Sequence, residues 1–202
     1  MKYRVILLFC LTAGLSFCCL TFSGFQTTDT TSSFTPDTGV NGIQLLRWKT
    51  TVDHFGEDTS FVNARIRRHI NYDFPYADFT NNDESQRLQL FVHLGYGLHE
   101  LAIAEIRVKY AADFECRGCV KFPDDEYISS LGVKLGMSKE EVIQRVGKPS
   151  RSYFVKTIEV LEYRNSNLNS SFLRRYNQPS YFAYYRFKEG LLNSYHIGFD
   201  TH

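Results

Sequence analysis

The sequence lacks an excess of basic residues. Lysine and arginine number 23 against 22 acidic residues, and without Lys2 and Arg4 near the N-terminus the balance is 21 to 22. A nucleic-acid-binding protein normally carries a basic excess, because its lysines and arginines must displace phosphate counterions. We therefore expect no nucleic-acid partner.

The sequence also lacks the short motifs that carry common chemistry. It contains no glycine-rich phosphate loop, no HExxH metal motif and no nucleophile elbow. Its six histidines are scattered along the chain. His196, Asp200 and His202 share strand parity, but a solvated strand face explains that spacing better than a ligand set does. We expect no cofactor, no metal site and no enzymatic activity.

Charge is missing from Val5–Phe25, directly after the basic segment Met1–Arg4. This order of a basic and then an apolar region is typical of an export signal. Three outcomes remain open for residues 1–25: a membrane-spanning anchor, cleavage near Ser23, or lipid attachment at Cys18 or Cys19. Each outcome places the rest of the chain outside the cytoplasm, at the cell envelope.

Apolar residues are also scarce in residues 26–40, which are rich in threonine and serine. Such a segment cannot bury enough surface to offset the entropy of folding, so it is predicted to be a flexible tether. The whole chain is nevertheless 43% hydrophobic and 15% aromatic. We therefore expect a packed core after the tether.

The part of the chain after the tether contains a weak internal repeat. The segment from Gly42 to Gly56 parallels the segment from Gly132 to Gly147 with one gap. Each copy then reaches two strand-like segments joined at a glycine. The predicted units are a first repeat at 41–112, a connector at 113–130 and a second repeat at 131–202.

The second repeat predicts a capped helix. Ser138 and Glu141 have the spacing of a capping box, and Val142 and Val146 fall on one helix face. Gly147 ends the predicted helix. A shorter helix is expected in the matching part of the first repeat, which ends at Gly56.

Strand signals follow in both copies. Apolar and polar residues alternate through residues 103–110 and 181–188, and Glu189–Gly190 forms a turn into residues 191–199. Residues 88–94 form the other predicted strand of the first repeat. Antiparallel meanders with a helix on one face give the predicted fold class, α+β with two helix-plus-antiparallel-sheet repeats.

The stretch LGVKLGMSKEEV at residues 131–142, followed by Gly147 and Pro149, resembles the SmpA/OmlA (BamE-like) envelope domain. The hairpin FKEGLL at residues 187–192 is also similar to that group. Present in tandem, the units resemble the β-lactamase inhibitor protein architecture. The resemblance implies a small exported protein that binds envelope proteins, in outer-membrane assembly or as an inhibitor, rather than an enzyme.

Cys116 and Cys119 form the only cysteine pair outside the leader. Outside the cytoplasm a local disulfide is the favoured interpretation. A redox-active pair is less favoured because no helix is predicted to follow it, and a zinc pair would need two further ligands.

Alternation along the strands predicts a surface for partners. If Tyr185 and Phe187 face the helix, then a set of aromatic and basic residues faces away, which is the composition of protein interfaces. This candidate interface comprises Phe91, His93, Phe182, Tyr184, Arg186 and His196. Packing of this face between the repeats is the alternative. The leading hypothesis is a non-enzymatic, extracytoplasmic protein-binding module. A thiol-redox protein and a small apolar ligand-binding or lipid-binding domain are the alternatives.

Overall fold

The computed structural model describes residues 33–47, 76–93, 102–111 and 119–200. About half of these residues lie in strands, and α3 and α4 are the two helices among them. In chain order the elements are β1 (Gly39–Val40), β2 (Ile43–Gln44), β3 (Tyr76–Thr80), β4 (Gln86–His93), β5 (Ala102–Tyr110), β6 (Val120–Lys121), α3 (Lys139–Val146), β7 (Arg151–Val155), β8 (Ile158–Asn165), α4 (Ser171–Tyr176), β9 (Ser180–Lys188) and β10 (Leu191–Asp200).

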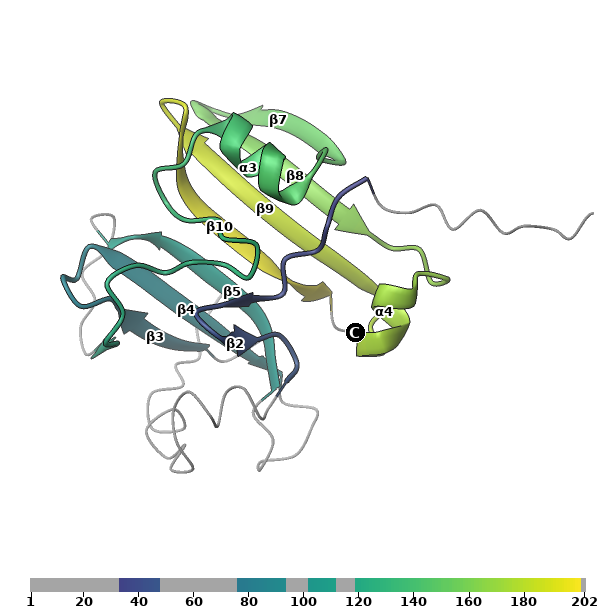
Figure 1. The fold of residues 1–202 in the computed structure, drawn as a ribbon, viewed down its shortest axis with the longest axis horizontal. Helices are drawn as coiled ribbons and strands as arrows, with labels where there is room; N and C mark the ends of the chain where they lie inside the picture. The colour runs from purple at the N-terminus through teal and green to yellow at the C-terminus, as the bar shows by residue number, and fades with distance from the viewer. Residues whose placement is uncertain (1–32, 48–75, 94–101, 112–118, 201–202) are drawn as a thin grey trace, which may run out of the picture.

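Eight strands form one sheet in the order β6-β3-β4-β5-β10-β9-β8-β7 (Figure 1). Neighbouring strands are antiparallel except β3 and β6, which are parallel. At the centre, β5 pairs with β10 from Gly198 opposite Glu105 to Ser194 opposite Lys109. Outward from this pair, β4 and β3 follow on one side, and β9 and β8 follow on the other. The two halves of the chain therefore share one sheet.

The predicted fold class, α+β with two helix-plus-sheet repeats, is wrong. The structure is mostly strand, and one mixed sheet of eight strands runs through both halves. Both described helices come from the second half, and the segment where the first repeat's helix was expected lies outside the described residues. Alternation within a strand predicts which side chains share a face, but it carries no information about which strand edges pair.

Helix α3 forms as predicted. The Ser138 hydroxyl accepts from the Glu141 amide, and the Glu141 carboxylate accepts from the Ser138 amide, so the capping box is confirmed. Val142 and Val146 are buried. Gly147 ends the helix at φ 103°, where an added Cβ would lie 2.7 Å from the Ser33 carbonyl oxygen.

The predicted hairpin strands are also confirmed. Strands β9 and β10 are joined by Glu189 and Gly190, both at positive φ, as a two-residue hairpin turn requires. Strands β4 and β5 lie where the first repeat predicted them.

The N-terminal boundary differs from the prediction. Residues 33–40, assigned to the flexible tether, are part of the folded body. Phe34 and Asp37 are buried, and the Thr35 amide donates to the Val146 carbonyl at 2.8 Å. The Phe34 ring packs on Tyr163 and Tyr181, at centroid distances of 5.2 and 6.2 Å. Phe34 and Val40 thus anchor the end of the Thr/Ser-rich segment in the hydrophobic core.

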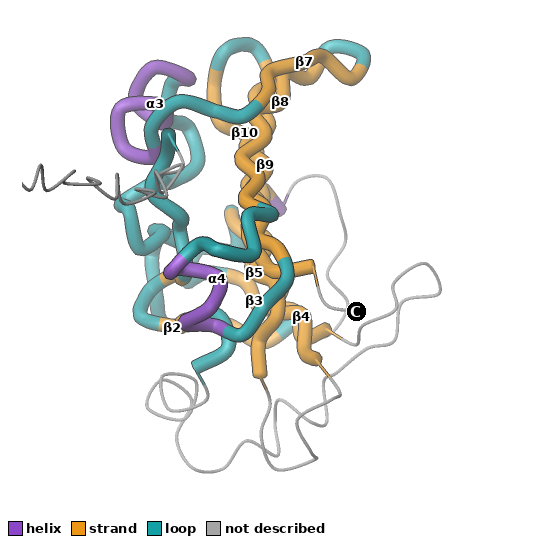
Figure 2. The backbone as a smooth tube through the Cα atoms, turned by 90° about the vertical axis from the view of Figure 1, so that its right-hand side faces the viewer, coloured by secondary structure: helices purple, strands orange, loops and turns teal. Residues whose placement is uncertain are grey.

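The sheet has two chemically different faces. We call the face that carries the hydrophobic core the packed face. It holds buried side chains from every long strand, from both helices and from the β1–β2 hairpin, including Leu88, Ile106, Ile197, Tyr185, Leu161, Val142, Leu173 and Ile43. Helices α3 and α4 and strand β2 lie on this side of the sheet (Figure 2). Among the described residues, no helix covers the opposite side, which we call the polar face.

Candidate functional site

The register of the strands places a row of polar side chains across the polar face. His196 of β10 lies opposite Arg107 of β5 and Tyr184 of β9. Residues directly opposite one another in antiparallel strands point to the same side. From one edge to the other the row reads Asp78, Gln89, Arg107, His196, Tyr184, Glu162 and Arg151.

His196 lies at the centre of this row and is held by two charged neighbours. Its Nε2 lies 2.6 Å from Glu105 Oε2, and its Nδ1 lies 3.5 Å from Arg107 Nη2. A guanidinium can only donate, so Nδ1 is the acceptor, and Nε2 carries the proton that it donates to Glu105. Burial lowers the pKa of His196, and the bond to Glu105 opposes that shift only in part. The imidazole is therefore neutral at neutral pH, in one defined tautomer.

Aromatic rings surround the imidazole. Phe182 meets it edge-on at 5.0 Å, and Phe91 lies 5.8 Å away, measured between ring centroids. The guanidinium of Arg186 lies 5.3 Å from the Tyr184 ring centroid, and that of Arg107 lies 5.1 Å from the Phe91 ring centroid. Cations at this distance are attracted by the negative faces of the rings. The central part of the polar face therefore alternates rings and guanidinium groups.

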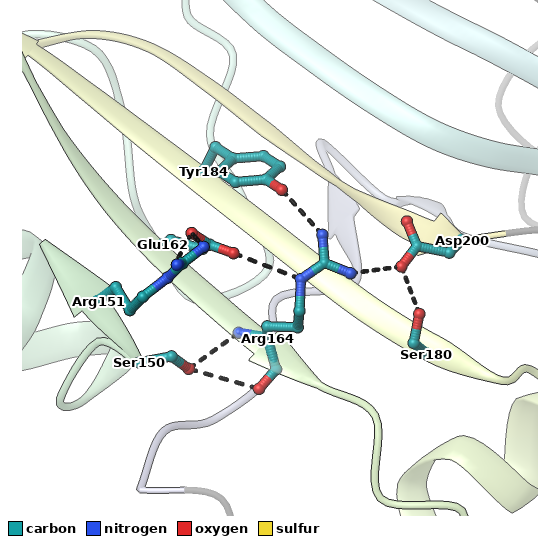
Figure 3. A network of polar contacts seen from close by, with 7 residues as sticks. All are labelled: Ser150, Arg151, Glu162, Arg164, Ser180, Tyr184 and Asp200. Atoms are coloured by element: carbon teal, nitrogen blue, oxygen red, sulfur yellow. Dashed lines mark hydrogen bonds and ion pairs between the residues drawn. The ribbon is translucent and has the colours of Figure 1, made fainter. Parts of the chain in front are cut away.

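A network centred on Arg164 organises the second half of the polar face (Figure 3). The Arg164 guanidinium donates to Asp200 Oδ2 at 2.6 Å, to the Tyr184 hydroxyl at 2.9 Å and to Glu162 Oε1 at 3.4 Å. Asp200 also accepts from the Ser180 hydroxyl. Tyr184 is thus held at its hydroxyl by Arg164 and approached at its ring by Arg186.

A smaller network lies on the first half. Arg87 and Asp78 form a two-pronged pair, with Nε to Oδ1 at 2.8 Å and Nη2 to Oδ2 at 2.5 Å. Gln89 donates to the same Oδ1 at 2.9 Å. Both charged side chains are almost fully buried, at 6% and 3% exposed. Removing one partner of such a pair would leave an uncompensated buried charge, which is strongly destabilising.

No protein-family model, curated protein or solved structure matches the chain. The resemblance to the SmpA/OmlA (BamE-like) domain and to the β-lactamase inhibitor architecture therefore stays a prediction from the sequence. Any inference about function therefore depends on the geometry of the chain itself.

The structure brings five of the six predicted interface residues together on the polar face. Tyr184 and Arg186 are half-buried and accessible in part, whereas Phe91, Phe182 and His196 are buried beneath or between their neighbours. The sequence predicted that this face points away from the helix and left open whether it is exposed or packed. Phe91, Phe182 and His196 lie on that face but are buried. His93 lies at the end of β4, and its side chain is outside the described part.

Sequence reasoning missed the charged residues that position this face. Glu105 and Arg107 were interpreted as positions on a solvated strand face, and Arg164 was not singled out, yet each bonds a ring or an acid from a neighbouring strand. Their signal is alternation of opposite charges along a strand. This pattern identifies the bonding partners of these residues only when the neighbouring strand is known.

The cysteine predictions stay untested. Cys119 lies directly before β6, and Cys116, Cys18 and Cys19 lie outside the described residues. The apolar run of residues 5–25 lies outside them too. Within the described ranges, no helix is long and apolar enough to cross a membrane, and no group of His, Cys, Asp or Glu has the arrangement of a metal site.

Proposed function

We propose that this chain is a non-enzymatic protein-binding module of the cell envelope, of the assembly-factor or inhibitor type, exported and tethered by residues 1–25. Export is supported by the basic and then uncharged N-terminus. Tethering by a spanning segment or by a lipid at Cys18 or Cys19 follows from the same residues. The partner is an envelope protein that binds the polar face.

One observation carries the proposal: the polar face presents tyrosine and arginine side chains that are already held in place. Tyr184 is fixed by Arg164 at its hydroxyl and by Arg186 at its ring. Tyrosine and arginine dominate the binding energy of protein interfaces. Because these side chains are ordered before binding, association loses less conformational entropy.

The charge pattern of the face supports a protein partner over a phosphate polymer. Acidic and basic groups alternate, as in Glu105 with Arg107 and Glu162 with Arg164. A folded protein surface offers both signs of charge in fixed positions, so a mixed face selects among protein partners.

The test is a crosslinking capture from native envelopes with the full chain, tagged at its C-terminus. The full chain is needed because Phe34 and Asp37 belong to the core. One saturable partner that is captured by the wild type and lost with the double variant Tyr184→Ala/Arg186→Ala supports the proposal.

The matched control is Arg174→Ala/Arg175→Ala, which removes charge from the exposed surface of α4 on the packed side. It should retain the partner. Equal capture by both double variants would remove the polar face from the proposal. Capture of no enriched protein would contradict the binding module itself and would favour a thiol-redox or ligand-binding role.

A further inference from the structure

Strand β7 forms one end of the eight-stranded sheet and pairs only with β8 within the described residues. The outer edge of an end strand carries backbone amides and carbonyls that can pair with another extended chain. Such edges are recognised by strand addition in several unrelated protein classes. The features of β7 that decide whether it is such a site are its exposure, its regularity and its charge.

Every residue of β7 is exposed. Tyr153, Phe154 and Val155 are 38%, 69% and 53% exposed, and they are three of the six large hydrophobic residues exposed in the described part of the chain. Their side chains alternate between the two sides of the sheet, with Tyr153 and Val155 on the polar side and Phe154 on the packed side. Apolar surface is thus presented on both sides of one free edge.

The edge is also regular. Strand β7 pairs with β8 through five consecutive register positions without a bulge, and it contains no proline. Natural proteins normally protect an edge with a bulge, a proline, charged side chains or a very short strand. The opposite end of this sheet shows such protection, because β6 has only two residues and Pro123 follows it closely. Within the described sheet, β7 is the longer of the two end strands, and the charge of Arg151 is its one protective feature.

The charges around β7 determine which kind of extended peptide segment could bind at this edge. Residues 148–158 contain three basic residues, Lys148, Arg151 and Lys156, and no acidic residue. Lys148 precedes the strand and Lys156 follows it, and both side chains are exposed. Two acids of β8 face the strand. Glu162 is shared by Arg151 and Arg164, and Glu159, opposite Phe154, is paired with Lys139, so the local balance stays positive.

A second copy of the chain fits this edge poorly. Two β7 strands would bring two segments together that each carry basic residues and no acid. With Tyr153 opposite Phe154 of the copy, Arg151 would lie opposite Lys156. Like charges directly opposite one another destabilise a strand pair.

We propose that β7 is a strand-addition site for an extended segment of a partner protein, apolar at its centre and acidic on both flanks. The partner's backbone would extend the sheet by one strand. Its central side chains would cover Phe154 on one side and Tyr153 with Val155 on the other. Its flanking carboxylates would meet Lys148 and Lys156. This site lies at the edge of the sheet and does not require the polar face.

The test uses two fluorescein-labelled peptides, EDVTVYVTDE and its charge-reversed counterpart KKVTVYVTKK, titrated with the full chain in detergent and followed by fluorescence anisotropy. The acidic-flanked probe should bind saturably and at least about tenfold more tightly than the basic-flanked probe, because two flanking charge pairs change from attraction to repulsion. An analogue of the acidic probe, N-methylated at alternate residues on its pairing edge, should lose binding because its backbone can no longer pair.

Charge reversal on the protein provides the decisive variant. Lys148→Glu/Lys156→Glu should invert the preference towards the basic-flanked probe, and Phe154→Ser should weaken the binding of both probes. All three side chains are exposed, so the circular dichroism melting curve should not change. The polar-face variant Tyr184→Ala/Arg186→Ala should bind the probe like the wild type, which separates this site from the proposed function.

Three results would overturn the proposal. One is the absence of saturable binding up to millimolar peptide, and another is equal binding of both probes before and after charge reversal. The third is a dimer of the chain, seen by sedimentation, that Phe154→Ser dissociates, since a second copy would then be the occupant.

Discussion

Asp37 is a carboxyl group folded into a layer of tyrosines. The Tyr185 hydroxyl donates to its Oδ2 at 3.3 Å, and Tyr181 bonds its backbone twice, accepting from the amide at 2.9 Å and donating to the carbonyl at 2.8 Å. Its Oδ1 has no hydrogen-bond partner of good geometry. Burial raises the pKa of Asp37 from 3.8 to about 6, and hydrogen bonds offset only part of the shift.

This shift predicts a pH-dependent stability. Because the folded state raises the pKa, the protonated form favours folding, and that contribution is complete below pH 3.8 and lost as the pH rises through about 6. A shift of this size means that, at neutral pH, the buried carboxylate makes the protein about 3 kcal/mol less stable than it is at acid pH. Asp37→Asn should therefore unfold at higher denaturant than the wild type at pH 8, with a smaller difference at pH 4.5.

Chemical denaturation at both pH values measures this difference directly. Burial lowers the pKa of His196, so its contribution has the opposite sign and is lost as the pH falls from 6.5 through its folded pKa. Both proteins contain His196, so comparing them isolates Asp37. A variant no more stable than the wild type at pH 8 would contradict the account.

The pKa of His196 provides a second prediction at the level of single residues. Glu105 raises the pKa of His196 and Arg107 lowers it. Glu105→Gln should therefore lower the pKa of His196 further, whereas Arg107→Gln should raise it. An NMR titration of the ring carbons, assigned with His196→Gln, measures both shifts. Shifts of the same sign in the two variants would show that the imidazole is not held between these two groups.

Helix α3 shows how far a local pattern determines an element. Its start is set by Ser138 and Glu141, which satisfy two amides that the helix itself cannot. Its end at Gly147 has a tertiary cause as well, because Ser33 and Phe34 occupy the space that a side chain at position 147 would need. The start was therefore predictable from neighbouring residues, whereas the contact at its end was not.

The cap predicts a measurable cost. Ser138→Ala should lower the free energy of unfolding by about 1 kcal/mol, because the Glu141 amide loses its acceptor. Ser138→Thr keeps the hydroxyl and should lose much less. Urea denaturation of the three proteins gives the comparison. Equal losses in both variants would attribute the effect to packing at this position.

At the scale of the whole molecule, the pairing of β5 with β10 joins the two halves. At Gly198 an added Cβ would lie 2.9 Å from the Ala104 carbonyl oxygen and 2.8 Å from Glu105 Cγ. Backbone is fixed in place here, so a side chain can fit only if the strands separate. The hydrophobic core also contains residues from both halves, from Leu88 to Phe199.

Gly198→Val should therefore destabilise the whole protein by about 1–3 kcal/mol through overpacking. The loss should appear as one shifted transition, with far-ultraviolet and near-ultraviolet circular dichroism still coincident, since neither half keeps a complete core alone. Ser194→Val, a half-buried position on the same strand and face, serves as the control and should change stability little. Two separate transitions would mean that the halves fold independently.

The sequence by itself determined the local structure: the capped helix over Lys139–Val146, the hairpin turn at Glu189–Gly190 and the face on which Tyr184 and His196 lie. These features depend on hydrogen bonds and side-chain alternation between near neighbours. Only the tertiary structure decided that β5 pairs with β10, that Asp37 lies under tyrosines more than 140 positions away, and that Arg164 holds Tyr184. Those contacts depend on which strand edges and buried groups meet across the chain, and residue spacing carries no record of that choice.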